Sequence, residues 1–253
     1  MNDSPVLPRL VLVHGTRMNS AQWDPYRTLM HDAEVVAIDL PGHGVRVGEE
    51  FTTDGAVAAI SAAVDGRAPD QPVVLAGHSL GGYMASVYAA RHPDVLDVLV
   101  LIGATADPVG PLTAVYRGFA AILPRVGPER MARVANAVMR GLGAKGQAAD
   151  VLPDGSAYAA LPAAWEAVIA DCGPGLLQGV RCPVFLVNGQ WDQMRVHVRR
   201  YAALTPYPRV VTVPHATHLM PSTHAPQVAA LLQEAVGLAS FRGRPAPRPT
   251  MEG

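Results

Sequence analysis

The feature that most constrains the fold of this chain is a series of six short apolar runs separated by segments of helical pattern. The runs are rich in Val and Ile and apolar at nearly every position, which is typical of strands buried on both faces of a parallel sheet. The pattern predicts an α/β fold with a doubly wound, mostly parallel sheet. We expect its strands at residues 10–13, 35–38, 73–76, 98–102, 184–187 and 210–213.

Helical patterns fill most of the gaps between these runs, and we expect helices at residues 21–30, 54–64, 80–91, 196–203 and 226–236. One long gap, residues 105–181, contains no convincing strand and is rich in Ala, Gly and Pro, with helical patches at 112–123, 129–140 and 157–170. An insertion at this point would cover the carboxyl ends of the strands, where open α/β sheets bind ligands. The predicted organisation is an α/β core of residues 1–104 and 182–240, a mainly helical lid at 105–181 and a flexible tail at 241–253.

Composition excludes several classes of function. The chain has 253 residues, of which 49% are hydrophobic, and its formal net charge is −1. It therefore lacks the basic surface that nucleic acid requires, and no apolar run approaches the length of a membrane span. Cys172 and Cys182 have no metal-like spacing, so we expect two reduced thiols in a cytoplasmic protein, with no metal or cofactor. The expected partner is a small-molecule substrate, and the sequence also allows a homodimer.

A serine between two glycines stands where one predicted strand turns into a helix. Gly77 and Gly81 lie two residues before and two residues after Ser79, between the apolar run at 73–76 and the helical pattern at 80–91. In so sharp a turn the side chains at these two positions would collide, and glycine removes them. Ser79 would then be held in a strained conformation with its hydroxyl above the sheet edge, beside the first N–H groups of the helix. This context favours Ser79 as a nucleophile.

A serine nucleophile needs a base, because its hydroxyl is a poor nucleophile at neutral pH. His218 and His215 both lie in the loop after the last predicted strand, where a side chain reaches the sheet edge. We favour His218, and His215 is its direct competitor. The imidazole also needs an acid to orient it. Asp192, in the loop after the strand at 184–187, is the preferred acid, and Asp107, after the preceding strand, is the alternative.

A tetrahedral intermediate needs hydrogen-bond donors for its negative charge, which together form an oxyanion hole. The backbone N–H of Leu80, next to the nucleophile, is one candidate. The second is the backbone N–H of Thr16, in the loop after the first predicted strand. His14 comes directly off that strand, and we expect it to order the loop rather than act as the base.

These motifs together resemble the α/β-hydrolase superfamily, in its capped serine esterase, lactonase and cofactor-free haloperoxidase-like branch. The resemblance extends from residue 10 to about residue 238. The matching motifs are VHG at 13–15, DLPGHG at 39–44, GHSLGG at 77–82, GQWD at 189–192, and His218 preceded by VP at 213–214.

The resemblance implies a Ser–His–Asp triad on Ser79, His218 and Asp192, in the family's chain order of nucleophile, acid and base. It also implies oxyanion donors at Thr16 and Leu80. The loop at 39–44 resembles a structural loop of the family and receives no chemical role. Ser rather than Asp at the elbow disfavours the dehalogenase and epoxide hydrolase branches.

Such a triad transfers an acyl group to water, so the leading hypothesis is a serine hydrolase acting on a carboxylic ester, lactone or thioester through an acyl-enzyme. The apolar side chains and few carboxylates of residues 105–181 favour an apolar substrate of small to medium size. Two alternatives stay open. One is an enzyme of another class with the same triad, such as a carbon–carbon hydrolase, lyase or biosynthetic cyclase. The other is a non-catalytic ligand-binding scaffold.

Overall fold

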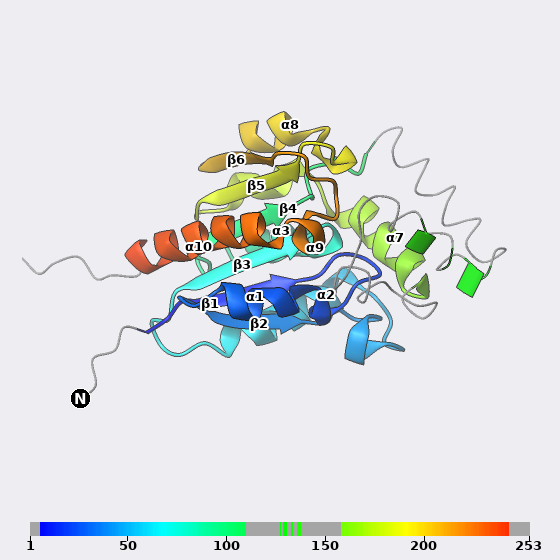
Figure 1. Ribbon diagram of the computed structural model, residues 1–253, viewed down its shortest axis with the longest axis horizontal. Coiled ribbons are helices and arrows are strands. Elements are labelled where there is room, and N and C mark those ends of the chain that lie inside the picture. Colours follow the sequence, from blue (N-terminus) through cyan, green and yellow to red (C-terminus); the bar gives the residue numbers. More distant parts are fainter. Residues whose placement is uncertain are drawn as a thin grey trace, which may run out of the picture.

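A parallel sheet of six strands forms the centre of the computed structural model, which describes residues 6–109, 127, 129–130, 133, 136–137 and 158–242. The strand order is β2-β1-β3-β4-β5-β6, so the chain moves to one edge of the sheet and then returns past β1 to the other edge (Figure 1). This reversal makes the sheet doubly wound, as predicted. The strands are β1 (Arg9–Val13), β2 (Glu34–Ile38), β3 (Val73–His78), β4 (Val98–Ile102), β5 (Val184–Gly189) and β6 (Pro208–Val213).

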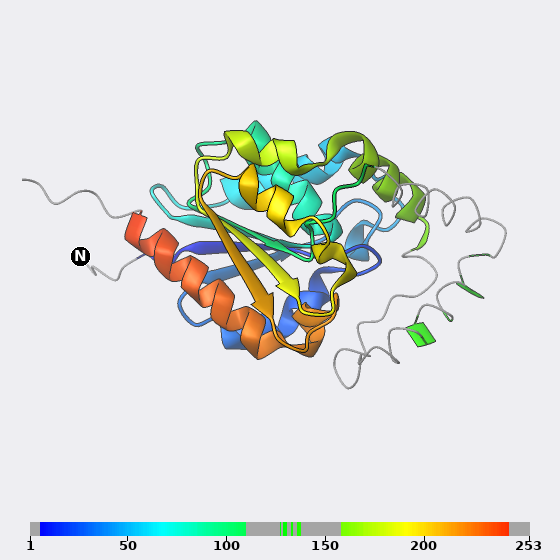
Figure 2. The ribbon, with the colours of Figure 1, turned by 90° about the horizontal axis from the view of Figure 1, so that it is seen from above.

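Helices cover both faces of this sheet (Figure 2). Helices α1 and α10 contribute to the core on one face, and α2, α3 and α8 contribute to the core on the other. Helix α7 lies beyond the carboxyl ends of the strands, toward which the arrowheads point (Figure 1). The α-helices are α1 (Asp24–Leu29), α2 (Thr53–Asp65), α3 (Leu80–Arg91), α7 (Leu161–Asp171), α8 (Val198–Ala203), α9 (Met220–Thr223) and α10 (Ala225–Arg242). Short 3-10 helices include η1 (Ser20–Trp23), η2 (Gly44–Arg46), η4 (Pro174–Gly179) and η5 (Gln193–Arg195).

Burial differs between the middle of the sheet and its edges. Strands β1, β3, β4 and β5 are buried at nearly every position, as their continuous apolar runs predict. Strand β6 is exposed along most of its length, and Val210 is 50% exposed. The expectation that every strand is buried on both faces is therefore wrong for β6. It is an edge strand, with a neighbouring strand on one side only.

One predicted helix is divided into two. The segment predicted as a helix at 21–30 opens with the 3-10 helix η1, whose first turn is capped because Ala21 N–H donates to the Asn19 side chain at 2.9 Å. Helix α1 follows with a proline in its first turn. Proline has no N–H, so it is tolerated at this position but cannot continue the hydrogen bonding of the preceding turn.

Part of the predicted insertion at 105–181 is described, and it includes helix α7 near the predicted helix at 157–170. The predicted helix at 112–123 and most of that at 129–140 lie outside the described residues, as does most of the predicted tail at 241–253. The division into core and lid stays a prediction. Cys172 and Cys182 are buried and not joined in a disulfide. Within the described ranges, no helix combines the length and apolarity that a membrane crossing requires.

Candidate active site

Ser79 lies in the turn between β3 and α3 with φ of 51° and ψ of −116°, a conformation that non-glycine residues rarely adopt. Its backbone N–H donates to the Ile102 carbonyl at 2.8 Å. A Cβ on Gly77 would strike the backbone of Gly81, and a Cβ on Gly81 would lie 2.5 Å from the carbonyl oxygen of Val13. Both glycines are therefore sterically required, the second because the elbow packs against β1.

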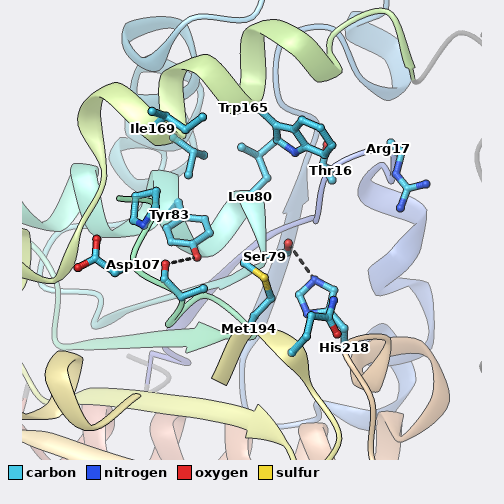
Figure 3. Close-up of a pocket in the computed structure, with 14 residues that line it drawn as sticks. Thr16, Arg17, Ser79, Leu80, Tyr83, Asp107, Trp165, Ile169, Met194 and His218 are labelled. Carbon is cyan, nitrogen blue, oxygen red and sulfur yellow. Dashed lines mark hydrogen bonds between the residues drawn. The ribbon is translucent and has the colours of Figure 1, made fainter. Parts of the chain in front are cut away.

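Three side chains from three separate loops form one hydrogen-bonded chain, of which Figure 3 shows the link between Ser79 and His218. His218 Nε2 lies 3.0 Å from Ser79 Oγ, and His218 Nδ1 lies 3.0 Å from Asp192 Oδ1. The parallel register explains this meeting, because Gly189 at the end of β5 pairs with Val213 at the end of β6. The loops after these strands therefore emerge at the same edge as the elbow. The structure thus brings together the three side chains that the sequence predicts for catalysis.

The surroundings of Asp192 favour its ionised form. Burial by itself raises the pKa of a carboxyl, but the hydrogen bond and charge of His218 and the N–H of Met194, at 2.8 Å, outweigh it. The pKa of Asp192 therefore lies below its ordinary value. The carboxylate accepts the Nδ1 proton of His218, which leaves Nε2 free to accept a proton from Ser79.

Gly103, directly after β4, makes room for this pair, and the sequence reasoning missed it. Its φ is +59°, and a Cβ there would lie 2.9 Å from both Asp192 Oδ2 and His218 Nδ1. The Gly103 N–H donates to the Val187 carbonyl at 2.8 Å, which holds the backbone in place. A glycine directly after a buried strand, at the edge that carries the elbow, is the signal that points to it.

The competing base and acid take other positions. His215 is exposed, and its backbone N–H donates to Gln190 Oε1 at 2.9 Å. Asp107 is buried, but its carboxylate pairs with the guanidinium of Arg200 rather than with the imidazole of His218. Neither side chain takes part in the hydrogen-bonded chain that begins at Ser79.

The backbone N–H groups of Thr16 and Leu80 are free donors: no described residue accepts a hydrogen bond from either of them. Both residues line the same cavity as Ser79. His14 supports the Thr16 loop from behind, since its Nε2 accepts from the Leu40 N–H at 3.0 Å. Burial lowers the pKa of His14 to about 3, so the ring is neutral and able to accept this bond.

A second chain of buried hydrogen bonds runs beneath the elbow, and the sequence pattern does not reveal it. Gly15 N–H donates to Gln22 Oε1 at 3.0 Å, Gln22 Nε2 donates to His78 Nδ1 at 2.9 Å, and His78 Nε2 donates to the His218 carbonyl at 2.9 Å. Because a backbone N–H can only donate, this order fixes the amide orientation of Gln22 and the tautomer of His78. Burial, helped by the neighbouring His218, lowers the pKa of His78 to about 3. These bonds tie the loop of Gly15 and Thr16 to the loop of His218.

A cavity of about 160 Å³ opens above Ser79 (Figure 3). Ser79 and His218 form its floor. Trp165, Val168 and Ile169 of α7 form its wall, and Figure 3 shows Trp165 and Ile169 on the side opposite His218. The other lining residues are Thr16, Arg17, Leu80, Tyr83, Ala106, Asp107, Pro108, Gln193 and Met194. In the part of the chain that the structure describes, His, Cys, Asp and Glu form no group suited to a metal ion.

A serine on a strand-to-helix elbow, with a histidine and a carboxylate at the same edge of a parallel sheet, defines the class of α/β-hydrolases. The model of the alpha/beta hydrolase family matches residues 10–231. The chain therefore belongs to the alpha/beta hydrolase family.

Individual proteins resemble this chain to different extents. It is 28% identical over 254 residues to a pimeloyl-[acyl-carrier protein] methyl ester esterase of Stenotrophomonas maltophilia, with 92% of this chain and 94% of that protein covered. It is 35% identical over 95 residues to Lipase LipV of Mycobacterium tuberculosis, a match that spans 37% of this chain but only 36% of that lipase. A thermophilic esterase from Thermogutta terrifontis has a TM-score of 0.75 at 23% identity, over 92% of this chain and 90% of that one. This last likeness shows the fold.

Proposed function

We propose that the protein is a serine hydrolase that cleaves a carboxylic ester, lactone or thioester of small to medium size through an acyl-enzyme. The observation that carries the proposal is the hydrogen-bonded chain from Ser79 through His218 to Asp192, whose first two members form the floor of a cavity. Relatives named as a methyl ester esterase and a lipase support ester cleavage.

The mechanism follows from the positions of these groups. His218 Nε2 removes the Ser79 proton as Oγ attacks the carbonyl carbon, and Asp192 stabilises the imidazolium that forms. The backbone N–H groups of Thr16 and Leu80 stabilise the oxyanion. His218 then protonates the leaving group, and a water molecule activated by the same nitrogen releases the acid.

The cavity indicates the size of the acyl group. A cavity of roughly 150 Å³ accommodates a benzene ring. The cavity above Ser79, at about 160 Å³, therefore suits an acyl group of about six heavy atoms. The apolar wall on α7 favours a hydrocarbon segment next to the reacting carbonyl.

Covalent labelling and ester turnover test the proposal. A fluorophosphonate should label Ser79, and Ser79→Ala should abolish labelling and lower kcat/KM for short p-nitrophenyl esters by about 10³-fold or more. Ser61→Ala is the control, because that hydroxyl bonds to Asp65 on helix α2, away from the cavity. The absence of both labelling and turnover would contradict the proposal. Labelling of Ser79 without turnover of any ester, lactone or thioester would favour another chemistry on the same triad.

We also propose that the enzyme acts in the cytoplasm. Cys172 and Cys182 are buried and not joined in a disulfide, which suits a reducing compartment. A homodimer stays a prediction, and light scattering of the purified protein tests it directly.

A further inference from the structure

Arg17 is the one charged side chain lining the cavity that meets no opposite charge among the described residues. Asp107 pairs with Arg200, and His218 pairs with Asp192. Among the described residues, the Arg17 guanidinium donates one hydrogen bond, to the Tyr158 hydroxyl at 2.7 Å. A guanidinium has five N–H donors, so most of them have no partner in the described part of the chain.

This arginine is held at the edge of the cavity rather than left to move in solvent. Its backbone has a φ of 62°, a conformation that persists only where the surrounding structure supports it. The guanidinium carbon lies 5.3 Å from the ring centre of Tyr158, which is itself 1% exposed. An aromatic ring beneath a guanidinium adds a cation–π attraction that restricts its position.

A second unpartnered donor lies beside Arg17. The Thr16 hydroxyl is buried, lines the same cavity and has no hydrogen-bond partner among the described residues. Leaving a buried hydroxyl unpaired is costly, so such a group in a cavity points to a ligand atom that completes it. Figure 3 shows Thr16 and Arg17 on one side of Ser79 and Asp107 on the other. The Asp107 carboxylate therefore does not occupy the part of the cavity beside Thr16 and Arg17.

We propose that Arg17 and Thr16 bind a carboxylate on the substrate, and that the preferred substrate is a monoester of a short dicarboxylic acid. This inference rests on the proposed function, because it assigns a substrate class to the same cavity. A guanidinium matches both oxygens of a carboxylate, and the hydroxyl supplies a further donor. The apolar wall then contacts the methylene segment between the two carbonyl carbons.

A matched pair of esters tests the assignment. Monomethyl glutarate and methyl pentanoate have the same acyl chain length and differ by the terminal carboxylate. The protein should prefer the anionic ester in kcat/KM by about ten- to a hundredfold, the range that a charge-assisted hydrogen bond provides. Arg17→Met should remove this preference and Arg17→Lys should keep part of it, whereas Arg199→Met, an exposed arginine on α8, should keep all of it. Equal rates for both esters in the unmodified protein, or an equal loss on both in Arg17→Met, would overturn the proposal.

Binding to an inactive variant separates this inference from the proposed function. Calorimetry on Ser79→Ala should show that monomethyl glutarate binds more tightly than methyl pentanoate, and that adding Arg17→Met removes the difference. Such binding without turnover by the unmodified protein would support the carboxylate site while contradicting the hydrolase proposal. Tighter binding of methyl 4-phosphonobutanoate than of monomethyl glutarate would assign the site at Arg17 and Thr16 to a phosphate group and overturn the carboxylate assignment.

Discussion

The floor and the wall of the cavity are built in different ways. On the floor, Ser79 and His218 are joined to each other, and His218 to the buried Asp192 behind it, by hydrogen bonds of 3.0 Å, and the three side chains pack around glycines that tolerate no Cβ. The wall consists of half-buried apolar side chains on α7, such as Val168 and Ile169. Directional bonds allow the floor one arrangement, whereas dispersion contacts tolerate changes of volume in the wall. We therefore expect the reaction to depend mainly on the floor and the fit of the acyl chain mainly on the wall, so that the two can change independently.

The largest expected effect comes from breaking the floor at its acid. In Asp192→Asn the amide cannot stabilise the imidazolium and favours the wrong tautomer of His218, so kcat for a short ester should fall by about 10³- to 10⁴-fold. Steady-state kinetics at neutral pH measures this loss. Asp107→Asn is the matched control, because Asp107 pairs with Arg200, and it should lower kcat by less than about tenfold. The reverse order of the two effects would make Asp107 the acid.

A smaller loss is expected when a methyl group is added next to the floor. In Gly103→Ala the new Cβ would lie 2.9 Å from Asp192 Oδ2 and His218 Nδ1, at a backbone φ of +59°. The two side chains must shift, and a displacement near 1 Å lowers kcat on the order of 10²-fold. Gly175→Ala is the control, since a Cβ there meets nothing within 4 Å. If the two variants retain equal activity, the floor is more adaptable than its contacts indicate.

The sequence predicts the parts of the molecule that depend on local patterns. The predicted strand at 98–102 and helix at 80–91 have the same bounds as β4 and α3. Three residues, Ser79, Asp192 and His218, each follow a strand that is recognisable from its apolar run. Because parallel strands end at the same edge of a sheet, the three side chains are expected at that edge.

Other features depend on which distant segments become neighbours, and no local pattern reports that. The His78 side chain bonds to the His218 carbonyl across 140 positions of the chain, and Gly103 matters only because Asp192 and His218 meet beside it. The exposure of β6 likewise follows from its place at the edge of the sheet. These features need the strand order and register, which apolar runs alone do not determine.

Low pH should reduce the free energy of unfolding through His78, which lies beneath the elbow. Its pKa is lowered from 6.5 to about 3 in the folded protein, chiefly by burial, so between these pH values the unfolded chain binds a proton that the folded protein excludes. Stability is therefore lost as pH falls below 6.5, by up to about 1.4 kcal/mol per pH unit for this group.

Urea unfolding at a series of pH values measures this slope. His78→Gln removes the titrating ring, so its free energy of unfolding should fall less steeply than that of the unmodified protein between pH 6.5 and about pH 3. Above pH 7 the two curves should run parallel, which serves as the internal control. Identical slopes in the acid range would show that His78 takes up a proton in the folded state.

The smallest effect is expected from the wall. Ile169→Ala enlarges the cavity on the α7 side without touching the hydrogen-bonded floor, so kcat/KM for the shortest ester should fall by about threefold to tenfold, as expected for lost contact with one apolar side chain. The optimum acyl length should move to longer chains, because the added volume is apolar. Ile169→Leu conserves volume and should keep the original length profile. An equal loss of kcat/KM for every acyl length would instead mean that α7 supports the floor. The reaction and the choice of substrate would then not depend on separate parts of the cavity.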